Sequence, residues 1–137
     1  MQNMLNDLSY NNDKIKQALG ECNRWLNALD LLRDESYALK TTLSKVLDDN
    51  HTDKELIANA EHFHNLIIER DQYIKEISVD AKNQEKKLRE LYPGNTGNDK
   101  QWQKEQQKLR NEINYLKQDL QKMREDFNGK LLKHFRH

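Results

Sequence analysis

The chain has 137 residues, of which 34% are charged and 35% are hydrophobic, with four glycines, one proline and a net charge of zero. This balance argues against a compact α/β domain, which needs more turns and a larger core, and it favours long helices. The zero net charge also removes the general electrostatic case for nucleic acid or an anionic membrane as a partner. Disorder is the rival interpretation of so polar a chain, but the neutral charge and the regular apolar spacing argue against it.

The first expected helix covers about residues 3–48. Its apolar residues recur in steps of four and three, the spacing of a helix that is buried along one side. The series is Leu5, Leu8, Ile15, Leu19, Cys22, Leu26, Leu29, Leu32, Leu39, Leu43 and Val46. Two successive steps of three, from Leu26 to Leu32, predict a stammer that locally overwinds the helix. Whether residues 1–12 are helical and overhang the other helices stays open at this stage.

The second expected helix covers about residues 53–91. Thr52 and Glu55 have the spacing of a capping box, which predicts the start of the helix there. Its apolar seam is interrupted only by Arg70 and Gln84. The full series is Leu56, Ala60, Phe63, Ile67, Arg70, Ile74, Ile77, Ala81, Gln84, Leu88 and Leu91. We expect Arg70 to pack its stem and to carry its guanidinium to a carboxylate on the first helix, such as Asp34 or Glu35.

The third expected helix covers about residues 99–134. The segment 92–99 holds the only proline and two of the four glycines, so the second helix must end there, and Asn98 or Asp99 can cap the third. The seam of this helix is Trp102, Gln106, Leu109, Ile113, Leu116, Leu120, Met123 and Phe127, followed by Leu131. Gly129 is expected to loosen the last turns.

Short connections between three long seams predict an all-α, antiparallel up-down-up three-helix bundle, a single elongated helical domain over residues 1–137. Pairing the second and third helices at positions that sum to about 190 sets Gln84 against Gln106 and Phe63 against Phe127. The two glutamine amides would then satisfy each other and define the alignment. The first two helices are expected to pair at positions that sum to about 103.

Charge is unevenly distributed along the chain. Residues 1–81 carry 9 Lys and Arg against 15 Asp and Glu, whereas residues 82–137 carry 14 against 8. We expect the acidic first helix and the basic last helix to attract each other within one bundle or across a dimer. The alternative is a weakly basic docking face on the last helix.

Motifs that carry chemistry are scarce. Glu61 and His64 have the Glu-x-x-His spacing of di-iron helical bundles, but Phe63 occupies the seam between them and turns Glu61 outward. Cys22 lies on the seam, with no charged group placed to lower its pKa, and is expected to be a packed thiol. The chain has no glycine-rich phosphate loop and no catalytic motif. We therefore predict a protein that is not an enzyme, with no catalytic, cofactor-binding or metal-binding residues.

The single Cys22 suits a reducing compartment. No apolar run approaches the ~18 residues of a membrane span. The first seven residues lack the basic and apolar regions of a signal peptide. We expect a cytoplasmic protein with neither a membrane nor a nucleic acid as its partner.

Six apolar side chains lie outside the strict seams of their helices. They are Trp25, Leu31, Leu66, Ile68, Tyr73 and Val79. A three-helix bundle buries a wide stripe of each helix, so we expect about half of them to join the core. The remainder forms the candidate surface for a partner.

The seams also resemble the pattern of spectrin-type repeats, which are three-helix units with a tryptophan on the first and third helices. The residues that carry the resemblance are Trp25, Leu26, Phe63, Ile67, Ile74, Ile77, Ala81 and Trp102. The resemblance implies a spacer or docking surface. The chain is longer than one such repeat and carries the pattern once.

Three classes of function follow from these patterns. The first is a non-enzymatic interaction or scaffold module that self-associates, for example as a homodimer, or docks a protein partner through apolar helix surface. The alternative is a small chaperone or adaptor that captures an amphipathic helix of a client protein. An enzyme or metal carrier is the third.

Overall fold

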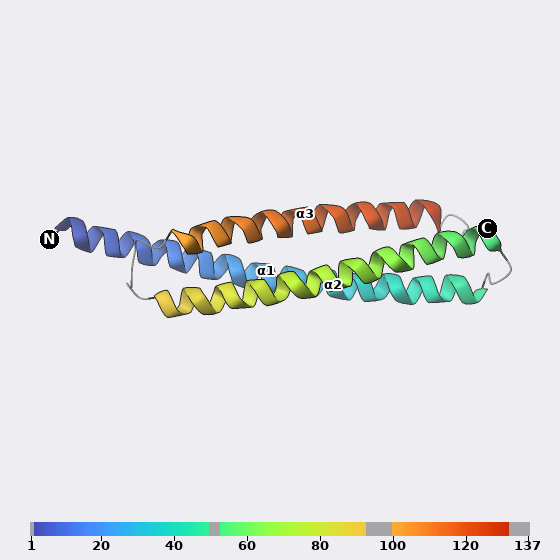
Figure 1. Cartoon of the computed structure of the whole chain (residues 1–137), viewed down its shortest axis with the longest axis horizontal. Coiled ribbons are helices and arrows are strands. Elements are labelled where there is room, and N and C mark those ends of the chain that lie inside the picture. The colour runs from blue at the N-terminus through green and yellow to red at the C-terminus, as the bar shows by residue number, and fades with distance from the viewer. Residues whose placement is uncertain (1, 50–52, 93–99, 132–137) are drawn as a thin grey trace. The chain divides into compact units, whose positions relative to one another are not determined.

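In a computed structural model the chain is described at residues 2–49, 53–92 and 100–131, with side chains from residue 12 onward in the first range. It forms three helices, α1 (Gln2–Asp49), α2 (Lys54–Leu91) and α3 (Gln101–Lys130), which are labelled in Figure 1. The predicted all-α fold is confirmed, and the predicted helix boundaries agree to within a few residues over the described ranges. The backbone of α1 is helical from Gln2.

The three helices contribute to two compact units. Unit 1 consists of Met1–Leu29 and Glu76–Asn114, and unit 2 consists of Asp30–Lys75 and Tyr115–His137. Each unit therefore contains a segment of every helix, packed as an up-down-up three-helix bundle. The prediction of one elongated domain concerns how the two units are joined and stays a prediction.

The start of α2 is capped by an acidic residue. The carboxylate of Asp53 accepts a hydrogen bond of 3.1 Å from the backbone amide of Leu56, and the Asp53 carbonyl accepts the first helical bond, from Ile57, at 3.0 Å. These are the bonds of an N-cap residue. The cap was predicted one residue earlier, at Thr52, which lies outside the described residues.

The other helix ends also follow local chemistry. The amide of Tyr92 still bonds to the Leu88 carbonyl at 3.1 Å, and Pro93, which follows in the sequence, disfavours a helical conformation at the residue before it. In α3 the first helical bond runs from the Lys104 amide to the Lys100 carbonyl at 3.2 Å. The predicted caps at residues 98 and 99, and the predicted helical residues 132–134, lie outside the described residues.

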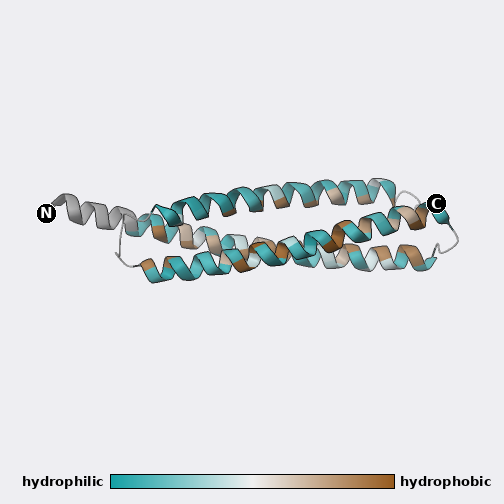
Figure 2. Ribbon diagram, in the orientation of Figure 1, coloured by the Kyte–Doolittle hydropathy of each residue, from teal (hydrophilic) through white to brown (hydrophobic). Residues whose placement is uncertain are grey.

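The seams of α2 and α3 are buried as predicted, apart from Arg70 and Leu91, which are half-buried. Hydrophobic residues recur along the ribbon of α2, while most residues along the ribbon of α3 are hydrophilic (Figure 2). Both buried glutamines, Gln84 and Gln106, lie within these seams. Over the described residues, every fully buried side-chain nitrogen and oxygen has a hydrogen-bond partner.

The predicted seam of α1 is wrong in phase at Leu19 and Leu26, and the stammer is absent. Its buried residues are Ile15, Ala18, Cys22, Trp25, Leu29, Leu32, Ser36, Leu43 and Val46. With half-buried Leu39 they form an unbroken alternation of three- and four-residue steps, whereas Leu19 and Leu26 are only half-buried. Ala18 and Trp25 each precede a leucine, and hydropathy alone favours the leucine as the seam residue.

The predicted alignment of α2 with α3 is confirmed in each unit. In unit 1, Gln84 bonds to Gln106 at 3.0 Å, and in unit 2 the rings of Phe63 and Phe127 meet edge to face with centroids 5.6 Å apart. Between α1 and α2, Ser36 bonds to Asp71 in unit 2, a pair whose positions sum to 107. Asp71 is half-buried beside the seam, so this bond does not define the layer, and the predicted sum of about 103 stays a prediction.

Candidate functional site

Trp25, the largest of the six residues predicted for a partner surface, is not at the surface. Only 6% of it is exposed, since it occupies a core position of α1 in unit 1. An indole at such a position contributes a large buried area to the bundle. The prediction for Trp25 is therefore wrong, and its role is to hold the helices together.

Three of the other five predicted residues are exposed. Leu31 is 65% exposed, Ile68 is 48% exposed and Val79 is 56% exposed, while Leu66 and Tyr73 are half-buried. Leu31, Leu66, Ile68 and Tyr73 belong to unit 2, and Val79 belongs to unit 1. The accessible part of the candidate surface is thus Leu31, Ile68 and Val79.

The predicted partner surface did not include three tyrosines that are exposed in the structure. Tyr37 and Tyr115 are the most exposed, and Tyr92 follows the last residue of α2. Tyr37 directly follows Ser36, which is fully buried, so it points away from the core. The predicted seam has the observed phase at Leu32, Leu39 and Leu43, so Tyr37 could have been selected from the sequence as an aromatic residue outside the seam.

A buried polar layer joins all three helices of unit 1 around Gln106. The side-chain nitrogen of Gln106 donates to the Ala18 carbonyl at 3.1 Å and to Glu21 at 2.9 Å. Its side-chain oxygen accepts from the Gln84 amide at 3.0 Å and from the Cys22 thiol at 3.8 Å. Both donors and the acceptor oxygen of Gln106 are therefore engaged, by groups on α1 and α2.

Glu21 extends this layer to the edge of the bundle. The guanidinium of Arg110 donates to it twice, from Nε to Oε2 and from Nη2 to Oε1, each at 2.7 Å. The hydrogen bonds from Arg110 lower the pKa of Glu21 below its usual value, against the opposing effect of partial burial. The same pair raises the pKa of Arg110. The carboxylate is thus held ionised, and it ties α1 to α3.

Cys22 behaves as a core residue of the same layer. Its side chain is fully buried, and burial raises the pKa of the thiol to about 11. Because the thiolate is the reactive form, such a thiol is a poor nucleophile and a poor metal ligand near neutral pH.

In unit 2 the ion pairs differ from those predicted. Arg70 bonds to Asp119 on α3 and to Glu69 next to it, so its expected partners Asp34 and Glu35 were wrong. The guanidinium leaves the core on the side of α2 that faces α3, where Asp119 lies. Glu35 instead pairs with Arg124 of α3 at 3.2 Å.

Two ion pairs join α1 to α3 and have the arrangement expected for an acidic first helix and a basic last helix. Glu21 pairs with Arg110 in unit 1 and Glu35 with Arg124 in unit 2, each with the acid on α1 and the arginine on α3. Both pairs join residues 89 positions apart, so the two segments of α1 run parallel to α3 in the same register. The acidic and basic halves of the chain thus attract each other inside each unit.

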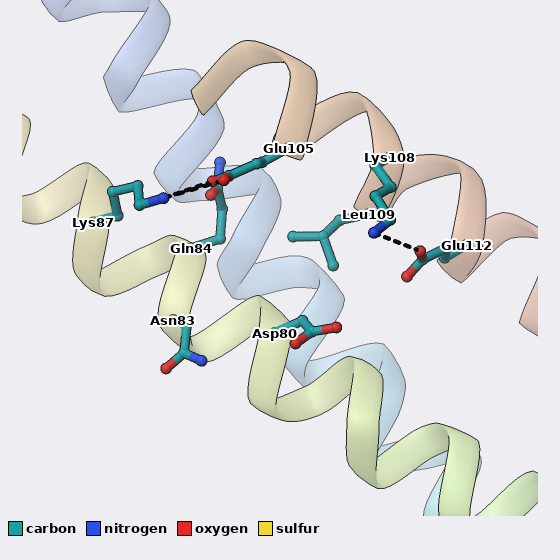
Figure 3. Close-up of a pocket in the computed structure, with 8 residues that line it drawn as sticks. All are labelled: Asp80, Asn83, Gln84, Lys87, Glu105, Lys108, Leu109 and Glu112. Atoms are coloured by element: carbon teal, nitrogen blue, oxygen red, sulfur yellow. Dashed lines mark hydrogen bonds and ion pairs between the residues drawn. The ribbon is translucent and has the colours of Figure 1, made fainter. Parts of the chain in front are cut away.

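An open groove of about 260 Å³ lies between α2 and α3 in unit 1 (Figure 3). Lys87 bonds to Glu105 across the groove at 2.9 Å, and Lys108 approaches Glu112 one turn along α3 at 3.9 Å. Asp80 also lines the groove. Most of its charges therefore have a partner within the chain, and the groove presents a mixed polar surface.

The Glu-x-x-His spacing does not form a cluster. Glu61, His62 and His64 are all exposed on α2, while Phe63 between them is buried. Among the described residues, nowhere do three or more His, Cys, Asp or Glu side chains gather as metal ligands.

No protein-family model, curated protein or solved structure matches this chain. None of the helices, over the described part of the chain, has the length and apolar character needed to cross a membrane. Inferences about function therefore depend on the side chains themselves.

Proposed function

We propose that the protein is a non-enzymatic helical scaffold that self-associates or docks a protein partner through apolar side chains on the outside of its helices. The observation that carries this proposal is the exposure of Leu31 and Ile68 in unit 2 and of Val79 in unit 1. All three lie outside the seams, where a large part of each apolar side chain stays in contact with water. Covering them would recover about 25 cal/mol for each Å² of apolar surface removed from water.

The interior of each unit suits a scaffold. Buried polar side chains are paired, and ion pairs join α1, α2 and α3 at the flanks of their seams. Because these contacts already fix the helices, binding a partner through their outer side chains costs little additional backbone entropy. A reducing compartment such as the cytoplasm suits the free thiol of Cys22.

Light scattering on the full chain, with and without lysine at each exposed position, tests the proposal. The variants are Leu31→Lys, Ile68→Lys and Val79→Lys, and the matched control is Asn65→Lys, an exposed polar position of α2. For self-association, we expect a mass above the 16.4 kDa of one chain, which falls to that value in at least one of the three variants and not in the control. Circular dichroism should show the same helicity in all of them.

For a protein partner, the chain itself is monomeric and captures a protein from cell extract. We expect that capture to be lost in at least one of the three lysine variants and retained in Asn65→Lys. A monomeric chain that captures nothing would refute the proposal, and so would association or capture that survives all three substitutions.

A further inference from the structure

We draw no further inference here: the strongest candidate, the groove between α2 and α3 in unit 1 that Asp80 and Glu112 line, rests on a pair of surface carboxylates beside Lys87 and Lys108, and nothing in the structure shows what fills it.

Discussion

Gln84 and Gln106 meet inside unit 1, where the amide nitrogen of Gln84 donates to the side-chain oxygen of Gln106 at 3.0 Å and to the Trp102 carbonyl at 2.9 Å. A buried amide that loses its partner costs about 1–3 kcal/mol, whereas replacing both partners by apolar groups of similar shape can be nearly neutral. We therefore expect the layer to contribute more to the choice of alignment than to net stability.

We expect Gln106→Leu to lower the free energy of unfolding by about 1–3 kcal/mol, because Glu21, the Ala18 carbonyl and Gln84 all lose a partner. The double variant Gln84→Leu/Gln106→Leu should cost less than the sum of the two single losses, since the bond between the two amides is lost only once and neither amide is left buried without the other. Urea denaturation followed by circular dichroism measures both quantities. Gln103→Leu, at an exposed position of α3, is the control and should change the unfolding free energy by less than about 0.5 kcal/mol.

If the losses from Gln84→Leu and Gln106→Leu simply add in the double variant, the two glutamines are not energetically coupled. The layer would then be two independent polar residues rather than a device that selects the alignment of α2 with α3.

The glutamine layer was predictable because the seams of α2 and α3 continue in unbroken alternating steps of four and three, from Leu56 to Leu91 and from Trp102 to Phe127. Only one phase fits such a pattern, and within it the two interior glutamines fall opposite each other. In α1 the pattern is ambiguous, since Trp25 stands next to Leu26 and both are apolar. A choice made by hydropathy takes the leucine, although the larger tryptophan gains more from burial.

The partner of Arg70 could not be predicted for a different reason. Its position in the seam follows from sequence, but the side of α2 from which its guanidinium leaves the core depends on how the other two helices are placed around α2. Asp119 is available on α3 because that helix faces the same side. Ser36 is likewise a core residue that hydropathy does not select, and its buried hydroxyl donates a hydrogen bond to Asp71.

The phase of α1 can be tested with two neighbouring substitutions. Trp25→Ala should lower the free energy of unfolding by about 3–5 kcal/mol, because it removes a fully packed indole. Leu26→Ala is the matched control and should cost about 1 kcal/mol, since that side chain is only half-buried. Urea denaturation of both variants provides the comparison. Equal losses, or a larger loss for Leu26→Ala, would restore the predicted stammer.

Glu21 makes the stability of the chain depend on pH. Its folded-state pKa lies below the ordinary value of 4.5, so its contribution is fully present above about pH 5 and is lost as pH falls through the folded-state pKa. We expect Glu21→Gln to lower the free energy of unfolding by about 1 kcal/mol at pH 7, and by less at pH 3. Denaturant unfolding at a series of pH values measures the difference.

The equivalent position in unit 2 is the control for Glu21. Glu35→Gln removes a carboxylate that pairs with Arg124 through a single contact of 3.2 Å, and it should cost less than about 0.5 kcal/mol at pH 7. A loss at Glu21 that is the same at pH 7 and pH 3 would mean that the charge of this carboxylate contributes nothing, and that only its shape matters.

The rate at which the buried thiol of Cys22 is alkylated measures how often unit 1 opens locally around it. Because the side chain is fully buried and its pKa is raised to about 11, alkylation by iodoacetamide at pH 7.5 should be at least about 100-fold slower in the native chain than in urea. The variant Cys22→Ala/Asn23→Cys moves the thiol to the neighbouring exposed position and should react at nearly the unfolded rate. Gln106→Leu should accelerate alkylation of Cys22, since it removes the acceptor of the thiol and loosens the contact between α1 and α3. Rapid alkylation in the unsubstituted native chain would show that the segment of α1 around Cys22 opens readily, and that the polar layer does not hold α1 against α3.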